Sequence, residues 1–460
     1  MPLKTIRFPI ILAAALAFLL PLPKTAQGAE RHKLQSKCQS GDVYSVTAKI
    51  QVQGTLQPSK DAKTAPLPMT VDGHFKYDEM RLDDGKKADR RSVRYYHEAA
   101  ASIQVDKHRD SPELRDDMRL VVVQVDKAAV SISSLRGPIT REELDLIDLP
   151  ANTLLLDALL PSGDVKVGGS WKISDLDLAR LTCVDVVSRN EVTCELSDVN
   201  NSIAEIKVAG RLSAAVGGVA TEIRLDGNAT FDFDRKCLTS IQLRIKERRS
   251  AGYTGPAMDV TADLHLQISP LARSEELAPA VVKEAAESNP ATHPLALRSE
   301  MGGYHLIYDR QWHVTRNETQ LVVLRLIDRG ELIAQCNISP LPKLDEGKSV
   351  SIEEFQTEVR KSLGKRFDHI ETAAEGKGAG GLKVLKVVAA GFASEIPIQW
   401  RYYLAIAPDG RRLALAYTME TDLVERFADA DAAMTESIEF DTASPTPASE
   451  SGPKGGNPSE

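Results

Sequence analysis

Hydrophobic and polar residues alternate along most of the chain between residues 44 and 269. Residues 43–52 show the alternation clearly, and residues 203–212 repeat it. A period of two places every second side chain on the same face of a strand. Similar runs recur at roughly regular spacing, namely 69–80, 118–125, 165–173, 220–234, 238–247 and 258–268. The pattern predicts a mainly antiparallel β domain over residues 29–270, a half-barrel or a sandwich with a helical insert.

The helical insert is predicted from a capping box. Thr140 can accept a hydrogen bond at a helix start, and Glu143 follows three residues later. Apolar residues then continue to residue 160. The dipeptides Asp72-Gly73 and Asp226-Gly227 are typical of tight turns and are expected to separate strands.

Residues 271–299 are rich in Ala, Glu and Pro and are predicted to be a linker with few tertiary contacts. The pattern of hydrophobic and polar residues changes after this linker. Strand candidates then alternate with helices, at 304–308, 321–327, 332–338, 382–389, 398–407 and 413–419. Pro408-Asp409-Gly410 predicts a hairpin between the last two. Ser351 with Glu354 opens one helix, and Thr421 or Asp422 opens another. Residues 300–440 are therefore predicted to form an α+β sandwich, an antiparallel sheet flanked by helices.

The two ends of the chain differ from the rest. Cations precede an apolar run over 8–20, followed by small residues, so residues 1–28 are predicted to be a signal peptide. Residues 441–460 lack large apolar side chains, which predicts a disordered tail. No later stretch is apolar enough to span a membrane, so the protein is expected to be exported, either periplasmic or extracellular.

The net charge of the chain argues against one class of partner, nucleic acid. The 460 residues carry a net charge of -8, and removal of Lys4, Arg7 and Lys24 with the signal peptide makes this -8 - 3 = -11. Nucleic acid needs a basic surface, so a nucleic-acid partner is not expected.

Five cysteines lie in the exported part. Residues 182–187 and 191–199 are predicted to form a hairpin that would place Cys183 opposite Cys194 for a disulfide. Cys38 and Cys237 are a second candidate pair. Cys336 alternates with apolar residues and is predicted to be a buried, free thiol.

Motifs for catalysis or cofactors have local structural explanations. Residues 376–381 match a glycine-rich nucleotide loop by spacing, but a strand follows where a helix is required, so a flexible loop is predicted. Neither histidines nor cysteines have the local spacing of a zinc site. We therefore assign no catalytic, cofactor-binding or metal-ligating residue and expect no cofactor.

Residues 161–171, Pro-Ser-Gly-Asp-Val-Lys-Val-Gly-Gly-Ser-Trp, resemble the P-x-x-x-V-x-V-G-x-x-W signature of a group of exported bacterial β-proteins. Residues 231–240 are similar to the segment that closes a hairpin in that group. The resemblance covers about residues 42–269 and implies a sheet like the half-barrel of lipoprotein carriers, which can enclose apolar ligands. Gly168 and Gly169 are expected to allow a tight strand entry, and Trp171 to cap a core.

Residues 303–440 resemble PsbP-like domains in the order of their predicted strands and helices and in their pattern of hydrophobic and polar residues. The matching points are the segment ending at Trp312, the helix opened by Ser351, and Trp400 with the turn at Gly410. The resemblance implies a binding or assembly module and carries over no functional residue.

Three classes of function follow. The leading hypothesis is an exported, non-enzymatic binding or assembly protein of the cell envelope that binds a protein partner or an apolar ligand. The alternatives are a hydrolase built from distant His and acidic residues, and a purely structural envelope component.

Overall fold

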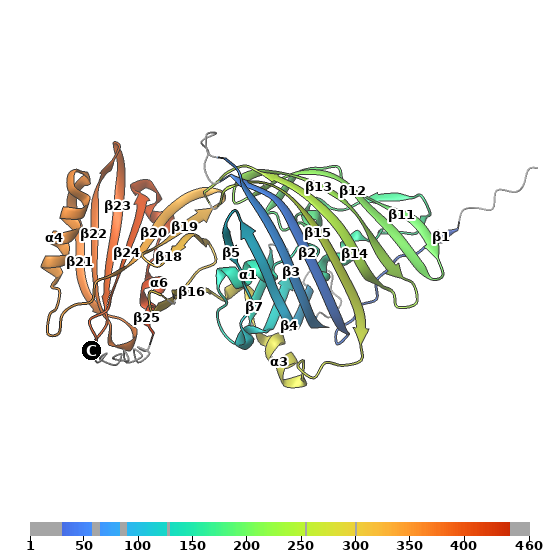
Figure 1. The fold of residues 1–460 in the computed structure, drawn as a ribbon, viewed down its shortest axis with the longest axis horizontal. Coiled ribbons are helices and arrows are strands. Elements are labelled where there is room, and N and C mark those ends of the chain that lie inside the picture. The colour runs from blue at the N-terminus through green and yellow to red at the C-terminus, as the bar shows by residue number, and fades with distance from the viewer. Residues whose placement is uncertain are drawn as a thin grey trace, which may run out of the picture.

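The computed structural model describes residues 30–57, 65–82, 90–126, 129–253, 255–299 and 301–441. The predicted signal peptide and all but the first residue of the predicted tail lie outside the described residues. The molecule is elongated, with a large sheet towards one end and a smaller sheet at the other (Figure 1). It is mainly antiparallel β, as predicted, with a few helices.

The larger sheet joins 13 strands of the described chain. In spatial order its main path is β7 Val130–Ser134, β6 Leu120–Val125, β4 Arg90–Val105, β3 Leu67–Arg81, β2 Val43–Gln57, β15 Ala257–Leu271, β14 Cys237–Arg249, β13 Val219–Asp232, β12 Ile203–Val216, β11 Thr193–Asn200 and β9 Ser170–Lys172. Off this path, β5 His108–Asp110 pairs with β4 and β10 Val186–Asn190 pairs with β12. A separate short pair joins β1 Arg31–His32 to β8 Val165–Lys166.

Strand alternation divides the large sheet into two chemically different faces. In β2, Val46 and Ala48 are buried, whereas Thr47 is exposed and Lys49 is partly exposed. The period-two prediction is confirmed here, because one face meets a packed core and the other meets solvent.

The sequence prediction missed β4 and misplaced two turns. Charged residues obscure the pattern of β4, since Arg94 is itself buried on the inner face. The Asp72-Gly73 and Asp226-Gly227 turns are wrong, because both dipeptides lie inside strands. At Gly227 a Cβ atom would lie 2.1 Å from the Gln242 carbonyl oxygen, so glycine there permits close approach of β14 and makes no turn.

Short helices pack against the buried face of the large sheet. They are η1 Asp116–Met118, α1 Arg141–Ile147, η2 Thr153–Leu159 and α2 Asp175–Leu181. The capping box of Thr140 and Glu143 is confirmed, but the insert is broken between α1 and η2. Leucines of η2 and α2 meet strand residues such as Val208 and Ile241 in one core.

Residues 271–299 are more ordered than a bare linker. They contain α3 Pro279–Glu287, η3 Pro290–Thr292 and β16 Leu295–Ser299. Leu277 and Ala285 are buried against Val93 and Val122 of the large sheet. The expectation of few tertiary contacts is therefore wrong, because α3 presents an apolar face that covers this part of β4 and β6.

The second part of the chain forms a seven-stranded antiparallel sheet among the described residues. Its spatial order is β18 Trp312–Glu318, β19 Leu321–Asp328, β20 Glu331–Leu341, β24 Arg412–Glu420, β23 Ile396–Ile406, β22 Lys383–Ala393 and β21 Phe367–Lys377. Beside it, β16 pairs with β17 Tyr304–Tyr308, and β17 with β25 Glu439–Phe440. All six predicted strands are present. The strands β18 and β21 were not predicted.

Helices complete the seven-stranded part. They are α4 Ile352–Leu363, η4 Gly364–Arg366, η5 Ala379–Gly381, η6 Thr421–Leu423, α5 Val424–Phe427 and α6 Ala432–Glu436. The capping box of Ser351 and Glu354 opens α4 as predicted. The second predicted helix is divided, because Ala428 adopts a φ of 48° between α5 and α6.

The two tryptophans of this sheet belong to different cores. Trp400 is buried with Phe355 of α4. Trp312 packs edge-on against Tyr417 and Phe427, with ring centroids 5.9 and 6.2 Å apart, in the core that continues from the large sheet. No helix among the described ranges is long and apolar enough to cross a bilayer.

Candidate functional site

Polar side chains form regular rows on the outer, solvent-facing side of the large sheet. Lys49 of β2 lies opposite His74 of β3 on one side and His265 of β15 on the other. His265 lies opposite Gln242 of β14, so these four residues form one row across four strands. A second row comprises Glu98, Lys76, Thr47, Gln267 and Ser240. We call the two rows together the polar face.

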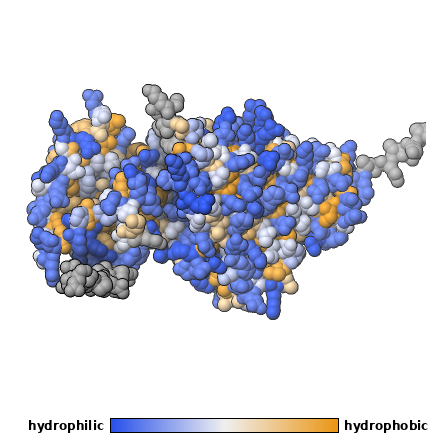
Figure 2. Space-filling model, in the orientation of Figure 1, coloured by the Kyte–Doolittle hydropathy of each residue, from blue (hydrophilic) through white to orange (hydrophobic). Residues whose placement is uncertain are grey.

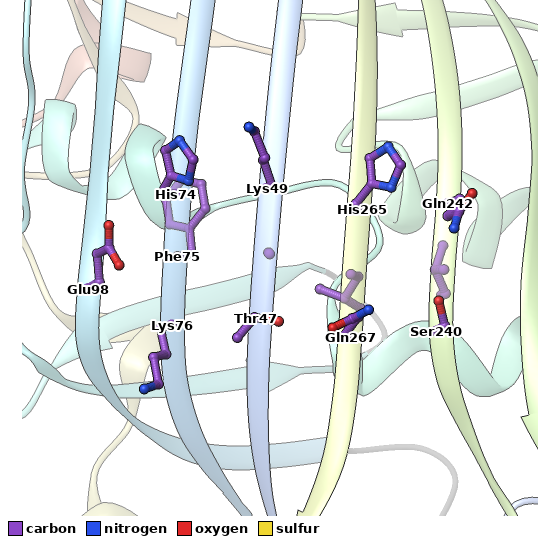
Figure 3. Close-up of a pocket in the computed structure, with 13 residues that line it drawn as sticks. Thr47, Lys49, His74, Phe75, Lys76, Glu98, Ser240, Gln242, His265 and Gln267 are labelled. Carbon is purple, nitrogen blue, oxygen red and sulfur yellow. The ribbon is translucent and has the colours of Figure 1, made fainter.

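A hollow of about 340 Å³ lies in the polar face. Its polar side chains come from β4, β3, β2, β15 and β14, which pair in that order, and Figure 3 shows them standing side by side. The intervening residues, including Phe75 and Ile241, turn into the core on the other side. Long strands in fixed antiparallel register therefore position every group of the hollow.

Charge is unequal across the hollow. Lys49 and Lys76 supply two cations against the single carboxylate of Glu98. At one rim Asp72 lies 3.2 Å from the His74 imidazole and 3.9 Å from the Lys49 ammonium. In Figure 2 the surface over the large sheet is mostly hydrophilic, with short hydrophobic streaks between polar side chains.

This arrangement favours recognition by hydrogen bonds and charge. Hydroxyl, amide, ammonium and imidazole groups can donate to an acidic or polar partner over several strands. Among the residues described in the hollow, neither His74 nor His265 hydrogen-bonds to a hydroxyl.

A second, smaller space lies beneath the same sheet. Its walls are almost entirely apolar and include Leu159 of η2, Leu178 of α2, and Leu225 and Ile241 of the sheet. Its volume of about 20 Å³ has room for about one water molecule. An acyl chain could enter only after η2 or α2 moved away from the strands.

The structure separates Cys183 from Cys194, and the predicted hairpin is wrong. The strands β10 and β11 both pair with β12, one after the other along it. Val186 lies opposite Ala215 and Cys194 opposite Val208, seven residues further along β12. At about 3.4 Å per residue, Val186 of β10 and Cys194 of β11 lie more than 20 Å apart along β12, so the two segments do not form the cross-strand pair that the predicted disulfide needs.

The other candidate pair is brought together. Cys38 and Cys237 line one small pocket, and the Lys37 amide donates to the Lys236 carbonyl at 3.0 Å. Burial, and then the neighbouring Cys38, raise the pKa of Cys237 to about 11. All five cysteines are free thiols in the structure. Cys336 is fully buried in β20, as predicted.

The signature residues of the first part have structural positions. Gly168 adopts a φ of +80°, and a Cβ atom on Gly169 would lie 2.6 Å from a Val165 methyl group, so both glycines serve the turn between β8 and β9. Trp171 is half-buried beside the core, and its indole nitrogen donates to the Leu159 carbonyl at 3.0 Å.

The hairpin signal of the second part is also confirmed. Gly410 has a φ of +88°, and its amide donates to the Ala407 carbonyl at 2.9 Å. The nucleotide-loop spacing of residues 376–381 falls on the end of β21 and on η5, where Gly380 has a left-handed φ of 61°.

No local sequence motif marks the polar face. Its groups come from strands nearly 220 residues apart in the chain, and each looks like an ordinary solvent-facing residue. The only sequence feature that could have indicated the site is the set of polar residues at every second position of each predicted strand. Only the register between strands assembles these groups.

Comparisons with known proteins give distant similarities of fold. No protein-family description matches the sequence, and no curated protein matches it. A cyanobacterial PsbP from Synechocystis is 14% identical, with 34% of this chain and 95% of that one covered and a TM-score of 0.27. The Saccharomyces cerevisiae Ran-binding protein Mog1p is 11% identical, with 32% and 95% covered and a TM-score of 0.26. The likeness to PsbP and Mog1 domains thus spans about a third of the chain.

Proposed function

We propose that this chain is an exported, non-enzymatic binding or assembly protein of the cell envelope, and that its polar face receives a protein partner. The observation that carries the proposal is the pair of cross-strand rows around one open hollow. A broad, rigid face with spaced hydrogen-bond donors suits a protein surface better than a small substrate, which needs a deep enclosed pocket.

Charge supports a partner that presents acidic side chains at this face. Lys49 and Lys76 outnumber Glu98 among the charged groups that line the hollow, although Asp72 contacts Lys49 at the rim and the whole chain is acidic. Two lysines at fixed positions would orient such a partner.

An apolar ligand is the second candidate. It is supported by the apolar walls of the small space under the sheet, and it would require η2 and α2 to move away from the large sheet. Native mass spectrometry of protein purified from its source separates the two candidates. A retained lipid-sized mass supports the apolar ligand, and a retained polypeptide supports the partner.

Charge reversal of the polar face should abolish partner binding. We expect the double variant K49E/K76E to bind at least tenfold more weakly, because two favourable charges become repulsive. Its free energy of unfolding should stay within about 0.5 kcal/mol of wild type, since neither side chain is buried. Co-purification from envelope extracts, with the partner identified by mass spectrometry, checks this.

The matched control is Lys246→Glu, which reverses one exposed charge on β14 away from the hollow. Equal capture of the same partner by wild type, K246E and K49E/K76E would overturn the polar-face proposal.

Export is tested at the N-terminus. We expect the mature protein to begin at Ala29 and to be found outside the cytoplasm. N-terminal sequencing of fractionated cells checks this, and recovery of Met1 on soluble cytoplasmic protein would contradict it.

A further inference from the structure

Three potential metal ligands meet on the outer side of the large sheet, next to the end of the hollow lined by Lys76 and Glu98. They are Asp78 of β3, His97 of β4 and Glu276 of the segment before α3. One ligand atom from each lies within 4.8 Å of the other two. The His97 Nε2 atom is 3.2 Å from the Asp78 Oδ2 atom.

Two features of the fold direct these side chains toward one another. The pairing of β3 with β4 slips between Lys76 and Tyr77, so His97 is the extra residue of a β-bulge. A bulge redirects a side chain that regular alternation would place elsewhere. Glu276 is held from the other side, because the next residue, Leu277, is buried against the sheet.

Burial gives this cluster an electrostatic cost. The Asp78 side chain is only 9% exposed, and its one described ion-pair partner is His97, which is 31% exposed. Glu276 brings a second carboxylate to the same place, held by a 3.1 Å hydrogen bond from the Ser274 hydroxyl. Two carboxylates beside one imidazole leave excess negative charge near a buried group, which a cation would offset.

We propose that Asp78, His97 and Glu276 bind one divalent transition-metal ion of the zinc class. One imidazole nitrogen and two carboxylate oxygens are ligands that zinc accepts at about 2.0–2.2 Å. Ligand atoms around such an ion lie about 3.4 Å apart, so the 3.2 Å His97–Asp78 pair already fits. Glu276, which is partly exposed, needs to approach by no more than about 1.4 Å, since its ligand atom lies within 4.8 Å of the other two. Three protein ligands leave a further position for water.

The bound ion would join the segment before α3 to strands β3 and β4. Residues 272–276 otherwise lie largely exposed at the start of the connection between the two parts of the molecule. Metal binding should therefore protect this segment, and the nearby Arg273 peptide bond offers a trypsin site in it. The inference is independent of the polar-face proposal.

The experiment uses the full mature protein after removal of metal with a chelator. Titration calorimetry with zinc chloride should show one site per chain that His97→Ala weakens at least tenfold. Calcium, which prefers six or more oxygen ligands, should not compete. Zinc should also slow tryptic cleavage after Arg273 in wild type but not in Glu276→Gln.

The control is His74→Ala. His74 lies 3.2 Å from Asp72, the same separation as in the proposed site, but no third ligand completes that pair among the described residues. Zinc affinity that is equal in wild type and H97A, or no binding by folded wild type, would overturn the proposal. If H97A fails to fold, Glu276→Gln decides by the same two measurements, because its side chain lies at the surface edge of the cluster.

Discussion

Replacement of Glu79 by alanine is expected to lower the free energy of unfolding by about 3 to 5 kcal/mol. Glu79 faces the interior from β3, and its carboxylate accepts hydrogen bonds from Arg94 at 2.9 Å, Ser92 at 2.7 Å and Thr153 at 2.9 Å. The Glu79 and Arg94 side chains are 2% and 3% exposed. The alanine variant leaves the Arg94 cation buried without its carboxylate. Urea unfolding followed by circular dichroism measures the loss.

The same ion pair should make stability depend on pH. Burial opposes ionisation of Glu79, but Arg94, Arg81 and the hydroxyl hydrogen bonds outweigh it and hold the pKa below its ordinary value. A lowered pKa in the folded state stabilises the fold above the unfolded-state value of about 4.3. This contribution is lost as pH falls through the folded-state pKa. Unfolding free energies across the acidic range should fall more steeply in wild type than in Glu79→Gln.

Two variants test the mechanism. Glu98→Ala removes an exposed carboxylate from the adjacent strand and should change stability by no more than about 0.5 kcal/mol. The double replacement E79L/R94M removes both charges and should recover most of the loss. If E79A is as stable as E98A, the buried pair does not hold β3 and β4 against η2.

Oxidation is expected to join Cys38 to Cys237 and to stabilise the protein by about 5 kcal/mol. The bond closes a loop of about 200 residues, for which the chain-entropy model gives this value. Both cysteines line one pocket, and the backbone hydrogen bond between Lys37 and Lys236 aligns their segments. Each thiol loses one hydrogen, and oxidised glutathione accepts the two electrons and two protons.

Non-reducing peptide mapping and unfolding with and without reductant measure the bond. Cys38→Ser should unfold like reduced wild type, whereas Cys183→Ser, which alters an exposed cysteine, should keep the full effect. Cys336 should remain unlinked because it is enclosed by the core. A Cys183–Cys194 peptide would contradict the arrangement of β10 and β11 along β12.

Elements with strong local signals were predictable from the sequence alone. Alternation in β2 and β12 predicted strands, and the hydroxyl and carboxylate pairs at Thr140 and Ser351 predicted helix starts, because these patterns satisfy neighbouring backbone groups. Gly410 marked a hairpin since only the local backbone matters there. Burial of Cys336 also followed from its own strand pattern.

Contacts that depend on which strands are neighbours could not be predicted from local sequence, because long-range strand pairing sets them. Cys183 and Cys194 are close in sequence, yet β12 pairs with both of their segments and holds them apart. Cys38 and Cys237 are far apart in sequence, yet they line one pocket.

The candidate sites follow the same rule. Lys49, His74 and His265 share a row only because β2 lies between β3 and β15, and His97 reaches Asp78 and Glu276 only through a bulge and a packed connection. A local pattern fixes which face a residue takes. Which residues lie beside that residue depends on the register between distant strands and on the burial of apolar side chains. Neither of these can be recognised from a pattern of residues close together in the sequence.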